Sequence, residues 1–464
     1  MFLEPQALAQ RAFGAVALGD PRRDRRAVTL ATALFANPAA SLPQQCDGLA
    51  PLHAAYRLLG RPEVRHAALQ QSHWLQTRAA AAEHPTVLLV QDTTEVDYTA
   101  HPTTTGLGPI GDGRGRGYLL QTILAVVPQP RQVLGLAYQE PFLRQPAPRK
   151  AKGKRESSAQ RQKRPRESQV WSRAATAVGP PPAAVRWVHV GDAYSDIFDF
   201  LDACRRHGAD FLVRACQDRC ITQPDGAPGH LLQWARSLPA QDEYDLEVPA
   251  RNARPGQPAR PARQARMRLA FGTAALRPPQ HGGVGRRPIT VWVVRVWEAE
   301  PPAGEEPLEW VLLTSVPVRT VAEAHERVAW YRCRWLAEDY HQCLKTGCSI
   351  ERRELGSGAA LQRLLGFLGV VAVWLLQLRD AARLEPGRPA AQAVPEEVVR
   401  VVGRLRGRDS AGWTVGRFCQ ELAGLGGYLG RKCDGPPGWR TLWRGWLHAQ
   451  TVLLGVHIPY ELGP

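Results

Sequence analysis

"TVLLVQD", residues 86–92, is an apolar, β-branched run that ends in an aspartate. Such a run is typical of a buried strand, and we expect Asp92 to lie at the end of that strand. A second run of the same kind, "AVRWVHVGD" at 184–192, ends in Asp192. Together they suggest two strands of one sheet, with the two carboxylates side by side at neighbouring strand ends. Aspartates that only cap the loops after the strands would give the same pattern.

Further strands are expected around this pair. "YLLQTILAVV" (118–127) and "VLGLAYQEPF" (133–142) follow a glycine-rich loop that lacks the spacing of a phosphate-binding P-loop. A β-rich stretch runs from about 240 to 318. The chain on either side reads as helical. We therefore expect an α/β fold in three domains: a helical domain over 1–75, a sheet-based catalytic domain over 76–356, and a helical domain over 357–464.

The composition favours a polyanionic partner. The chain has 464 residues, of which 44% are hydrophobic, enough for a sizeable core. Lysine and arginine number 59 against 43 acidic residues, a net charge of +16. Nucleic acid is the first expectation, since cations that neutralise phosphates release counterions, and an acidic membrane surface is the second. The longest apolar stretch, Leu364–Leu376, is too short to span a bilayer comfortably and predicts a buried helix.

The cysteines favour a reducing compartment. There are nine, scattered and without a CxxC pair, which argues against a disulfide framework and against a zinc site. The start of the chain lacks a basic segment followed by a long apolar run, so we expect no signal peptide. A cytoplasmic location fits both observations.

Two segments carry concentrated positive charge. Asp20 and Pro21 predict the start of a helix that carries four arginines, which are either a solvated surface or a DNA contact. The four are Arg22, Arg23, Arg25 and Arg26. Residues 149–166 hold nine lysines or arginines and one glutamate. This segment is expected to be a solvated linker that is also able to touch DNA phosphates.

The stretch "YRCRWLAEDYHQCLK", 331–345, predicts a helix with no glycine or proline. On a helical wheel, Tyr331, Arg334, Glu338 and Lys345 fall within an arc of roughly 60°, whereas Asp339 falls outside it. Glu338 is therefore the better candidate for a third carboxylate. A stripe of surface ion pairs would give a similar wheel. Three convergent carboxylates suit two hard divalent cations such as magnesium or manganese, which promote in-line phosphodiester chemistry.

The spacing Tyr331-x2-Arg334-x3-Glu338-x6-Lys345 resembles the signature of the insertion-sequence-four family of DDE transposases, in particular the branch that includes the transposase of transposon Tn-five. Other matching segments include "QDTT" (91–94), "AYSDI" (193–197), "FLVR" (211–214) and "LEWVLLTS" (308–315). The resemblance implies a ribonuclease-H-like catalytic core, a mixed sheet flanked by helices, with the β-rich stretch as its insertion.

The resemblance also assigns roles to individual residues. Asp92, Asp192 and Glu338 would bind two Mg²⁺ ions, with Mn²⁺ as a substitute. Tyr331, Arg334 and Lys345 would hold phosphates of the transposon end. Trp310 would stack on a base extruded during hairpin formation, unless it is an ordinary core aromatic. Arg214 would contact DNA near the site.

The implied activity is cut-and-paste transposition. Water nicks a transposon end, the freed 3′-hydroxyl forms a hairpin, a second water opens it, and the 3′-hydroxyls attack target DNA. The implied partners are double-stranded DNA, as inverted-repeat ends and target, and a second copy of the chain in a homodimer; no membrane is involved. The helices of 1–75 would bind the ends and those of 357–464 would dimerise, in a bacterial-type cytoplasm at the nucleoid.

Two alternatives remain open at this stage. One is a non-catalytic regulator that binds DNA or dimerises, and the other is a ribonuclease-H-like, structure-specific nuclease. The intact carboxylates and basic helices argue against the regulator, and Trp310 with the Tyr-Arg-Glu-Lys spacing argues against the nuclease. The basic segment 149–166 departs from the expected pattern of the family branch, where the corresponding segment is acidic.

Overall fold

The computed structural model describes residues 4–144, 166–250, 259–279, 286–431 and 434–456. The chain forms two compact units, each built from separate stretches of sequence. The first unit comprises Met1–His84, Thr93–Pro146 and Trp335–Pro464, and the second comprises Pro85–Asp92 and Ala147–Arg334. Strand β1 (Thr86–Asp97) contributes to both units. The expected division into three domains stays a prediction.

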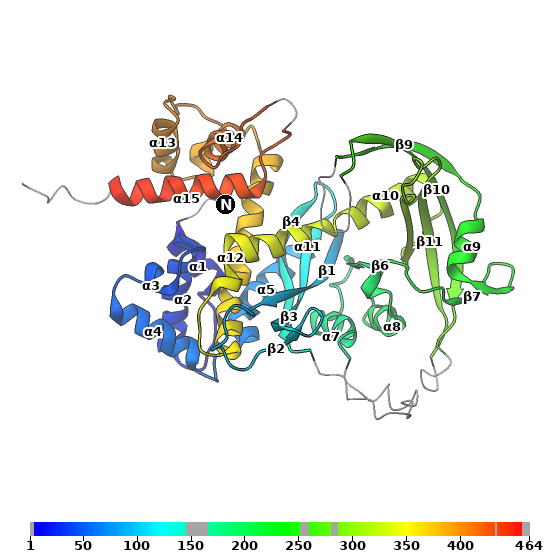
Figure 1. Cartoon of the computed structure of the whole chain (residues 1–464), viewed down its shortest axis with the longest axis horizontal. Helices are drawn as coiled ribbons and strands as arrows, with labels where there is room; N and C mark the ends of the chain where they lie inside the picture. Colours follow the sequence, from blue (N-terminus) through cyan, green and yellow to red (C-terminus); the bar gives the residue numbers. More distant parts are fainter. Residues whose placement is uncertain (1–3, 145–165, 251–258, 280–285, 432–433, 457–464) are drawn as a thin grey trace, which may run out of the picture. The chain divides into compact units, whose positions relative to one another are not determined.

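The second unit is built on a mixed sheet (Figure 1). Its strands run in the order β1-β5-β6-β12-β11-β10-β7-β8, and β9 pairs with β10. The first three strands are parallel and the pairs from β6 to β10 are antiparallel. The bounds are β5 (Arg186–Gly191), β6 (Asp210–Arg214), β7 (Cys220–Thr222), β8 (Pro228–His230), β9 (Asp242–Val248), β10 (Arg263–Leu276), β11 (Ile289–Glu298) and β12 (Glu309–Thr314).

The β-rich stretch extends this sheet. The stretch expected to be β-rich between 240 and 318 contains the strands β9 to β12. Because β12 pairs with β6, its residues join the antiparallel strands directly to the parallel ones. Buried apolar side chains alternate along β11, as expected for a strand with one covered face.

Helices accompany the sheet of the second unit. They are α7 (Gln169–Val178), α8 (Phe198–Arg206), α9 (Leu231–Ser237) and α10 (Val321–Arg332), with a 3-10 turn η1 (Ala193–Ser195). Trp171 of α7 packs against Phe200 of α8, with ring centroids 5.8 Å apart. Thr320 and Glu323 form a capping box that starts α10. A mixed sheet flanked by helices fits a DDE domain.

Helices dominate the first unit (Figure 1). Helix α2 begins as expected, because the Asp20 side chain accepts the N–H of Arg22 at 2.8 Å and Pro21 occupies the first turn. The N-terminal helices are α1 (Pro5–Phe13), α2 (Pro21–Ala36), α3 (Leu42–Gln45), α4 (Leu49–Gly60) and α5 (His66–Ala82). The later ones are α11 (Trp335–Gln342), α12 (Gly358–Leu384), α13 (Glu396–Leu405), α14 (Val415–Leu425) and α15 (Trp439–Val456), with short turns η2 (Cys343–Gly347), η3 (Ile350–Arg352) and η4 (Ala390–Gln392).

Strand β4 (Gln132–Phe142) of the first unit packs against α5 and α12, and the other strands of this unit lie beside it in the sheet. These other strands are β2 (Gly108–Ile110), β3 (Gly115–Val127) and the end of β1, with β3 between β2 and β1 and also paired with β4. Among the described residues, α12 is the one helix long and apolar enough to cross a membrane. However, 83% of its most apolar window is buried within the structure, as in the core helix of a soluble protein.

Three local expectations were wrong. Strand β1 does not end at Asp92 but continues to Asp97. The helical pattern of residues 193–208 predicts Ser195 as an N-cap, but helix α8 has Ile197 at that position; Ser195 belongs to the 3-10 turn, and its hydroxyl donates to the carbonyl of Asp192 at 2.6 Å. Residues 331–345 are not one helix.

The backbone hydrogen bonds show where the segment 331–345 departs from a regular helix. The N–H groups of Cys333 and Arg334 bond to carbonyls three residues back, at Trp330 and Tyr331, and so tighten the last turn of α10. Helix α11 then ends in a π-helical turn, η2, where the N–H of Cys348 reaches the carbonyl of Cys343 at 2.9 Å. The uniform wheel drawn over 331–345 therefore does not describe this segment.

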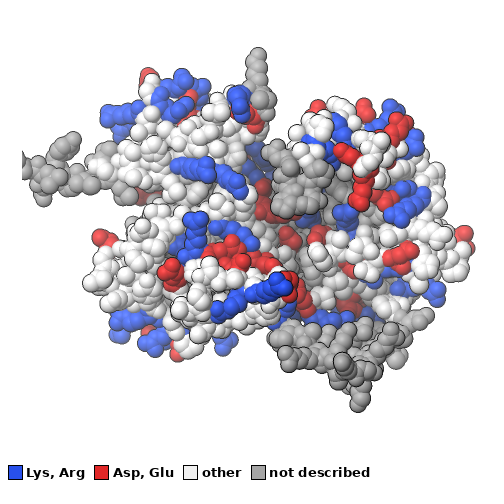
Figure 2. Space-filling view, viewed as in Figure 1, with Lys and Arg blue, Asp and Glu red and all other residues white. Residues whose placement is uncertain are grey.

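Surface charge and cysteines complete the description. On the face drawn in Figure 2, basic and acidic side chains are interspersed, so the net charge of +16 does not gather there into a patch of one sign. Each cysteine within the described ranges is a free thiol.

Candidate nucleic-acid and metal site

Three residues on neighbouring parallel strands form the centre of the candidate site in the second unit. Register places Val90 of β1 opposite Val190 of β5, and Val190 opposite Leu212 of β6. Counting two residues on from each of these positions reaches Asp92, Asp192 and Arg214. Two carboxylates and one guanidinium therefore stand at the same level, where neighbouring parallel strands carry their functional groups.

Asp192 is half-buried, and its surroundings act on its charge in opposite directions. Burial raises the pKa of Asp192, whereas the N–H groups of Tyr194 and Ser195 and the charges of Arg334 and Arg214 lower it. One carboxylate oxygen, Oδ1, accepts the Tyr194 N–H at 2.9 Å. The turn η1 therefore orients this carboxylate and leaves it in a cationic environment suited to phosphate.

Tyr331, at the end of α10, belongs to the same cluster. It is buried, with 5% of its surface exposed, so it does not lie on an open polar stripe. Its ring meets that of Trp310 edge to face, with centroids 5.2 Å apart and planes at 68°. Burial raises the pKa of Tyr331, and the charges of Arg334 and Arg214 lower it. Structure thus brings Tyr331, Trp310, Arg334 and Arg214 together around Asp192.

A cavity of about 440 Å³ opens beside Trp310. Its walls are mostly apolar and come from β9 to β12 and α10, and its polar lining includes His325, Glu309 and Arg332. His325 contacts Asp242 through Nε2 and Oδ2 at 2.6 Å, and its ring meets Tyr244 at 5.0 Å. A space of this size with aromatic walls fits a flat, hydrogen-bonding group such as a nucleobase.

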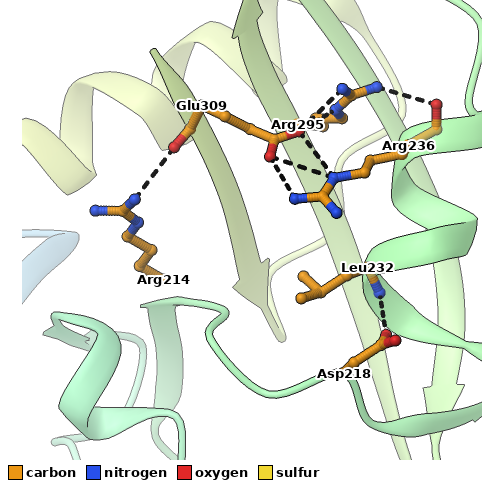
Figure 3. Close-up of polar contacts among 6 residues, drawn as sticks. All are labelled: Arg214, Asp218, Leu232, Arg236, Arg295 and Glu309. Carbon is orange, nitrogen blue, oxygen red and sulfur yellow. Dashed lines mark hydrogen bonds and ion pairs between the residues drawn. The ribbon is translucent and has the colours of Figure 1, made fainter. Parts of the chain in front are cut away.

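Side chains that the sequence did not single out surround the start of β12 (Figure 3). Glu309 accepts hydrogen bonds from Arg236 and Arg295, and its carbonyl accepts one from Nη2 of Arg214 at 3.3 Å. No local sequence pattern predicts this cluster, because Arg236 and Glu309 are 73 residues apart in the sequence.

In the first unit, α11 presents one of its two adjacent acids to solvent. Glu338 is exposed, whereas Oδ2 of Asp339 accepts from Nη1 of Arg379 at 2.6 Å. Asp339 is thus committed to an ion pair with α12. The preference for Glu338 over Asp339 agrees with this difference, and its role as a ligand stays a prediction.

Lys345 lies in η2 and forms an ion pair with Glu351, with Nζ and Oε1 3.0 Å apart. Glu351 is itself fixed, since the same oxygen accepts the N–H of Asp97 at 3.1 Å. Both side chains of the pair are about one-third exposed. The lysine is therefore held in place near the surface of its unit and is accessible to a phosphate.

The arginines of α2 remain available for a partner. Arg22, Arg25 and Arg26 are exposed and Arg23 is half-buried. Within the described part of the chain these four form no ion pair; Arg23 and Arg25 donate only to the backbone carbonyls of Leu18 and Pro21. The basic segment 149–166 lies, apart from Arg166, outside the described residues.

The described residues contain no group of three or more histidine, cysteine or acidic side chains arranged to hold a metal ion. The three predicted ligands are divided between the units, with Asp92 and Asp192 in the second and Glu338 in the first. The level pair of aspartates supplies the hard oxygen donors that magnesium and manganese prefer. Because both are oxygen donors, Asp92 and Asp192 fit a divalent cation of this kind.

Two segments of the chain match known protein families. Residues 5–64, which comprise α1 to α4, match the transposase DNA-binding family. Residues 187–375, which contain Asp192 and Glu338, match the transposase DDE domain. A DNA-binding domain followed by a DDE domain supports a transposase whose partner is DNA, and the DDE match supports metal-dependent chemistry.

Proposed function

We propose that this DDE transposase carries out cut-and-paste transposition, and that it belongs to the insertion-sequence-four family near the branch of transposon Tn-five. The level placement of Asp92 and Asp192 on neighbouring parallel strands carries the proposal. Two carboxylates so placed, in a chain whose first helices match a DNA-binding family, suit phosphodiester cleavage in DNA.

Asp92, Asp192 and Glu338 are the proposed metal ligands. Two Mg²⁺ ions, or Mn²⁺ in their place, would supply Lewis acidity to the attacking and leaving oxygens when bound. The chain's own contribution is to orient the ligands: η1 fixes Asp192 through the Tyr194 N–H, and the Asp339–Arg379 ion pair fixes α11 beside Glu338.

DNA is held by cations and aromatics. Arg214 and Arg334, whose charges already act on Asp192, would bind phosphates next to the scissile bond, with Tyr331 and Lys345 binding others. Trp310 would stack on a base extruded from the end, and the 440 Å³ cavity beside it would receive that base. The arginines of α2 would bind the transposon end.

The proposed reaction balances without a covalent enzyme intermediate. Water attacks a phosphodiester at the transposon end and releases a 3′-hydroxyl. That hydroxyl attacks the phosphodiester of the opposite strand, which joins the two transposon strands in a hairpin and releases the flanking DNA with a 3′-hydroxyl. A second water opens the hairpin, and the 3′-hydroxyls then attack target DNA. We further propose that a homodimer, joined through the C-terminal helices, performs these steps in the cytoplasm at the nucleoid.

The test is direct. Protein is incubated with Mg²⁺ and linear DNA that carries the inverted repeats flanking its gene, and the products are separated on denaturing gels. Hairpin-ended excision products support the proposal. Nicks without hairpins would indicate a structure-specific nuclease. Binding without cleavage would indicate the regulator.

Two matched variants complete this experiment. Asp192→Ala should abolish cleavage and leave end binding intact, and retained cleavage would overturn the assignment of Asp192. Asp199→Asn serves as the control, because Asp199 is an exposed aspartate of the same unit, in α8, and its one ion pair among the described residues is with Arg286. It should cleave like the unaltered protein.

A further inference from the structure

The start of strand β12 is held by a carboxylate between two guanidinium groups (Figure 3). Arg236 donates from Nη2 to Oε2 of Glu309 at 2.7 Å, and Arg295 donates from Nε to Oε1 at 2.9 Å. Hydrogen bonds from Arg236 and then Arg295 hold the pKa of Glu309 below its usual range, although burial acts in the opposite direction. The carboxylate is therefore charged at neutral pH and engaged at both oxygens.

Arg295 is itself fixed by its neighbours. Its Nη1 donates to the carbonyl of Arg236 at 3.0 Å, and its guanidinium lies 4.0 Å from the centroid of the Trp297 ring. Trp297 stands directly opposite Glu309 in the β11–β12 register. Glu309 is thus joined to α9 through Arg236 and to β11 through Arg295, by charge-assisted bonds of the stronger kind.

Glu309 is also joined to the DNA-facing residues. Its backbone carbonyl accepts from Arg214, and the next residue is Trp310. Successive side chains of a strand point to opposite faces, so the carboxylate and the Trp310 ring lie on opposite sides of the sheet. The ion pairs of the Glu309 side chain therefore hold the backbone from which the Trp310 ring projects on the other face. They also hold the Glu309 carbonyl that accepts the hydrogen bond from Arg214.

We propose that Glu309 is a positioning residue for the hairpin step, acting through Trp310 and Arg214. The inference rests on the proposed function, since it assumes that Trp310 stacks on an extruded base. Loss of the carboxylate would leave two guanidinium groups facing each other at the start of β12. Their repulsion would displace the two edge residues that pair with β11, Glu309 and Trp310.

The expected change is in the ratio of hairpin to nicked DNA and not in the total amount of DNA cleaved. The first nick needs Asp92 and Asp192, whereas the hairpin needs the extruded base to be held. With the terminal-repeat DNA described above, Glu309→Ala should lower the ratio of hairpin to nicked product about tenfold, because a misplacement of about 1 Å costs on the order of a hundredfold and Glu309 acts on Trp310 only indirectly. Arg236→Ala, on the exposed side of the cluster, should give a smaller loss in the same direction and serves if Glu309→Ala does not fold.

Asp202 offers a control. It is an acidic residue of the same unit that also bridges two arginines, Arg205 at 2.7 Å and Arg206 at 3.1 Å, but it lies on α8, and none of the three contacts Trp310 or Arg214 among the described residues. Asp202→Ala should leave the hairpin ratio unchanged. An equal loss with Asp202→Ala would show a general effect on the unit and overturn the inference.

A double-mutant comparison separates positioning from stability. If Glu309 acts through Trp310, then Glu309→Ala should add little to the loss caused by Trp310→Ala. If the loss of hairpin ratio in the double variant equals the product of the two single losses, the role of Glu309 is overturned while the proposed function stands. Absence of hairpins with the unaltered protein would overturn both, so the two failures are distinguishable.

Discussion

Asp192 and Arg214 lie at the same level of two neighbouring parallel strands, each two residues beyond the paired positions Val190 and Leu212. The guanidinium charge lowers the pKa of Asp192, and burial raises it. A carboxylate that is costly to bury is thus kept next to a cation that also suits phosphate. Such an arrangement is typical of a functional site more than of a stabilising ion pair.

Asp192→Asn should separate stability from activity. Since burial raises the pKa of Asp192, the folded protein favours its neutral form, and the charged form opposes folding as pH rises through that pKa. At neutral pH the amide variant should therefore melt no lower than the unaltered protein, while DNA cleavage falls on the order of a thousandfold. Thermal melts and gel assays measure both. A variant that melts well below the unaltered protein would contradict the first part.

Lys345→Ala should weaken binding of DNA ends in a salt-dependent manner. A lysine that contacts one phosphate contributes about 0.9 to the slope of log affinity against log salt, so the variant's slope should be shallower by about that amount. Fluorescence anisotropy over a range of salt concentrations measures this. Arg388→Ala is the control, because Arg388 is an exposed cation paired with Glu385 and should leave the slope unchanged. An unchanged slope for Lys345→Ala would remove Lys345 from the phosphate contacts.

Tyr340→Phe should destabilise the first unit. The Tyr340 hydroxyl accepts from Nε2 of Gln139 at 2.8 Å and donates to the carbonyl of Gly369 at 3.1 Å, and the side chain is fully buried. Its removal takes away two buried hydrogen bonds, at a cost of about 1–3 kcal/mol in the free energy of unfolding. Urea titration measures the difference. Tyr56→Phe, at an exposed tyrosine of the same unit, should change little.

Stability should fall in mild acid. Burial lowers the pKa of His66 to about 4, and that of His189 and His341 to about 3, from an ordinary value of 6.5. The unfolded chain then binds more protons, so stability is lost as pH falls below 6.5 and continues to fall towards the folded-state values. Each histidine contributes at most about 1.4 kcal/mol per pH unit.

His189→Gln provides the check on this pH dependence. Nδ1 of His189 lies 2.6 Å from Nε2 of Gln91 inside the sheet of the second unit. Removing one titrating group should make the plot of unfolding free energy against pH shallower by one histidine, measured by urea titration between about pH 7.5 and about pH 5. An equal slope in variant and unaltered protein would mean that His189 does not contribute.

Local patterns were enough to predict the two central strands. The apolar runs before Asp92 and Asp192 lie in β1 and β5, and the parallel pairing of these strands puts the two carboxylates at the same level, although β1 continues past Asp92 to Asp97. Asp20 and Pro21 start α2 as predicted because a capping side chain needs only its immediate neighbours.

The remaining features depend on contacts that local patterns do not contain. β1 continues past Asp92 because it gains a second neighbour, β3, which periodicity in one segment does not reveal. The turn at Cys333–Arg334 interrupts a sequence without glycine or proline, so propensity predicted a continuous helix. Glu309 is held by arginines brought to it from α9 and β11, and side-chain charges so far apart in sequence give no local signal.

The discontinuous first unit has a consequence for how the chain is made. Its helix α5 and strand β4 pack on α12, which the ribosome adds only after the whole of the second unit. Because domains fold as their residues emerge, the second unit is able to complete its sheet while the core of the first still lacks its central helix. Release of a shortened chain would therefore leave the early helices, including the DNA-binding ones, without the core that encloses them. The core of the first unit is therefore completed only during translation of the last third of the chain.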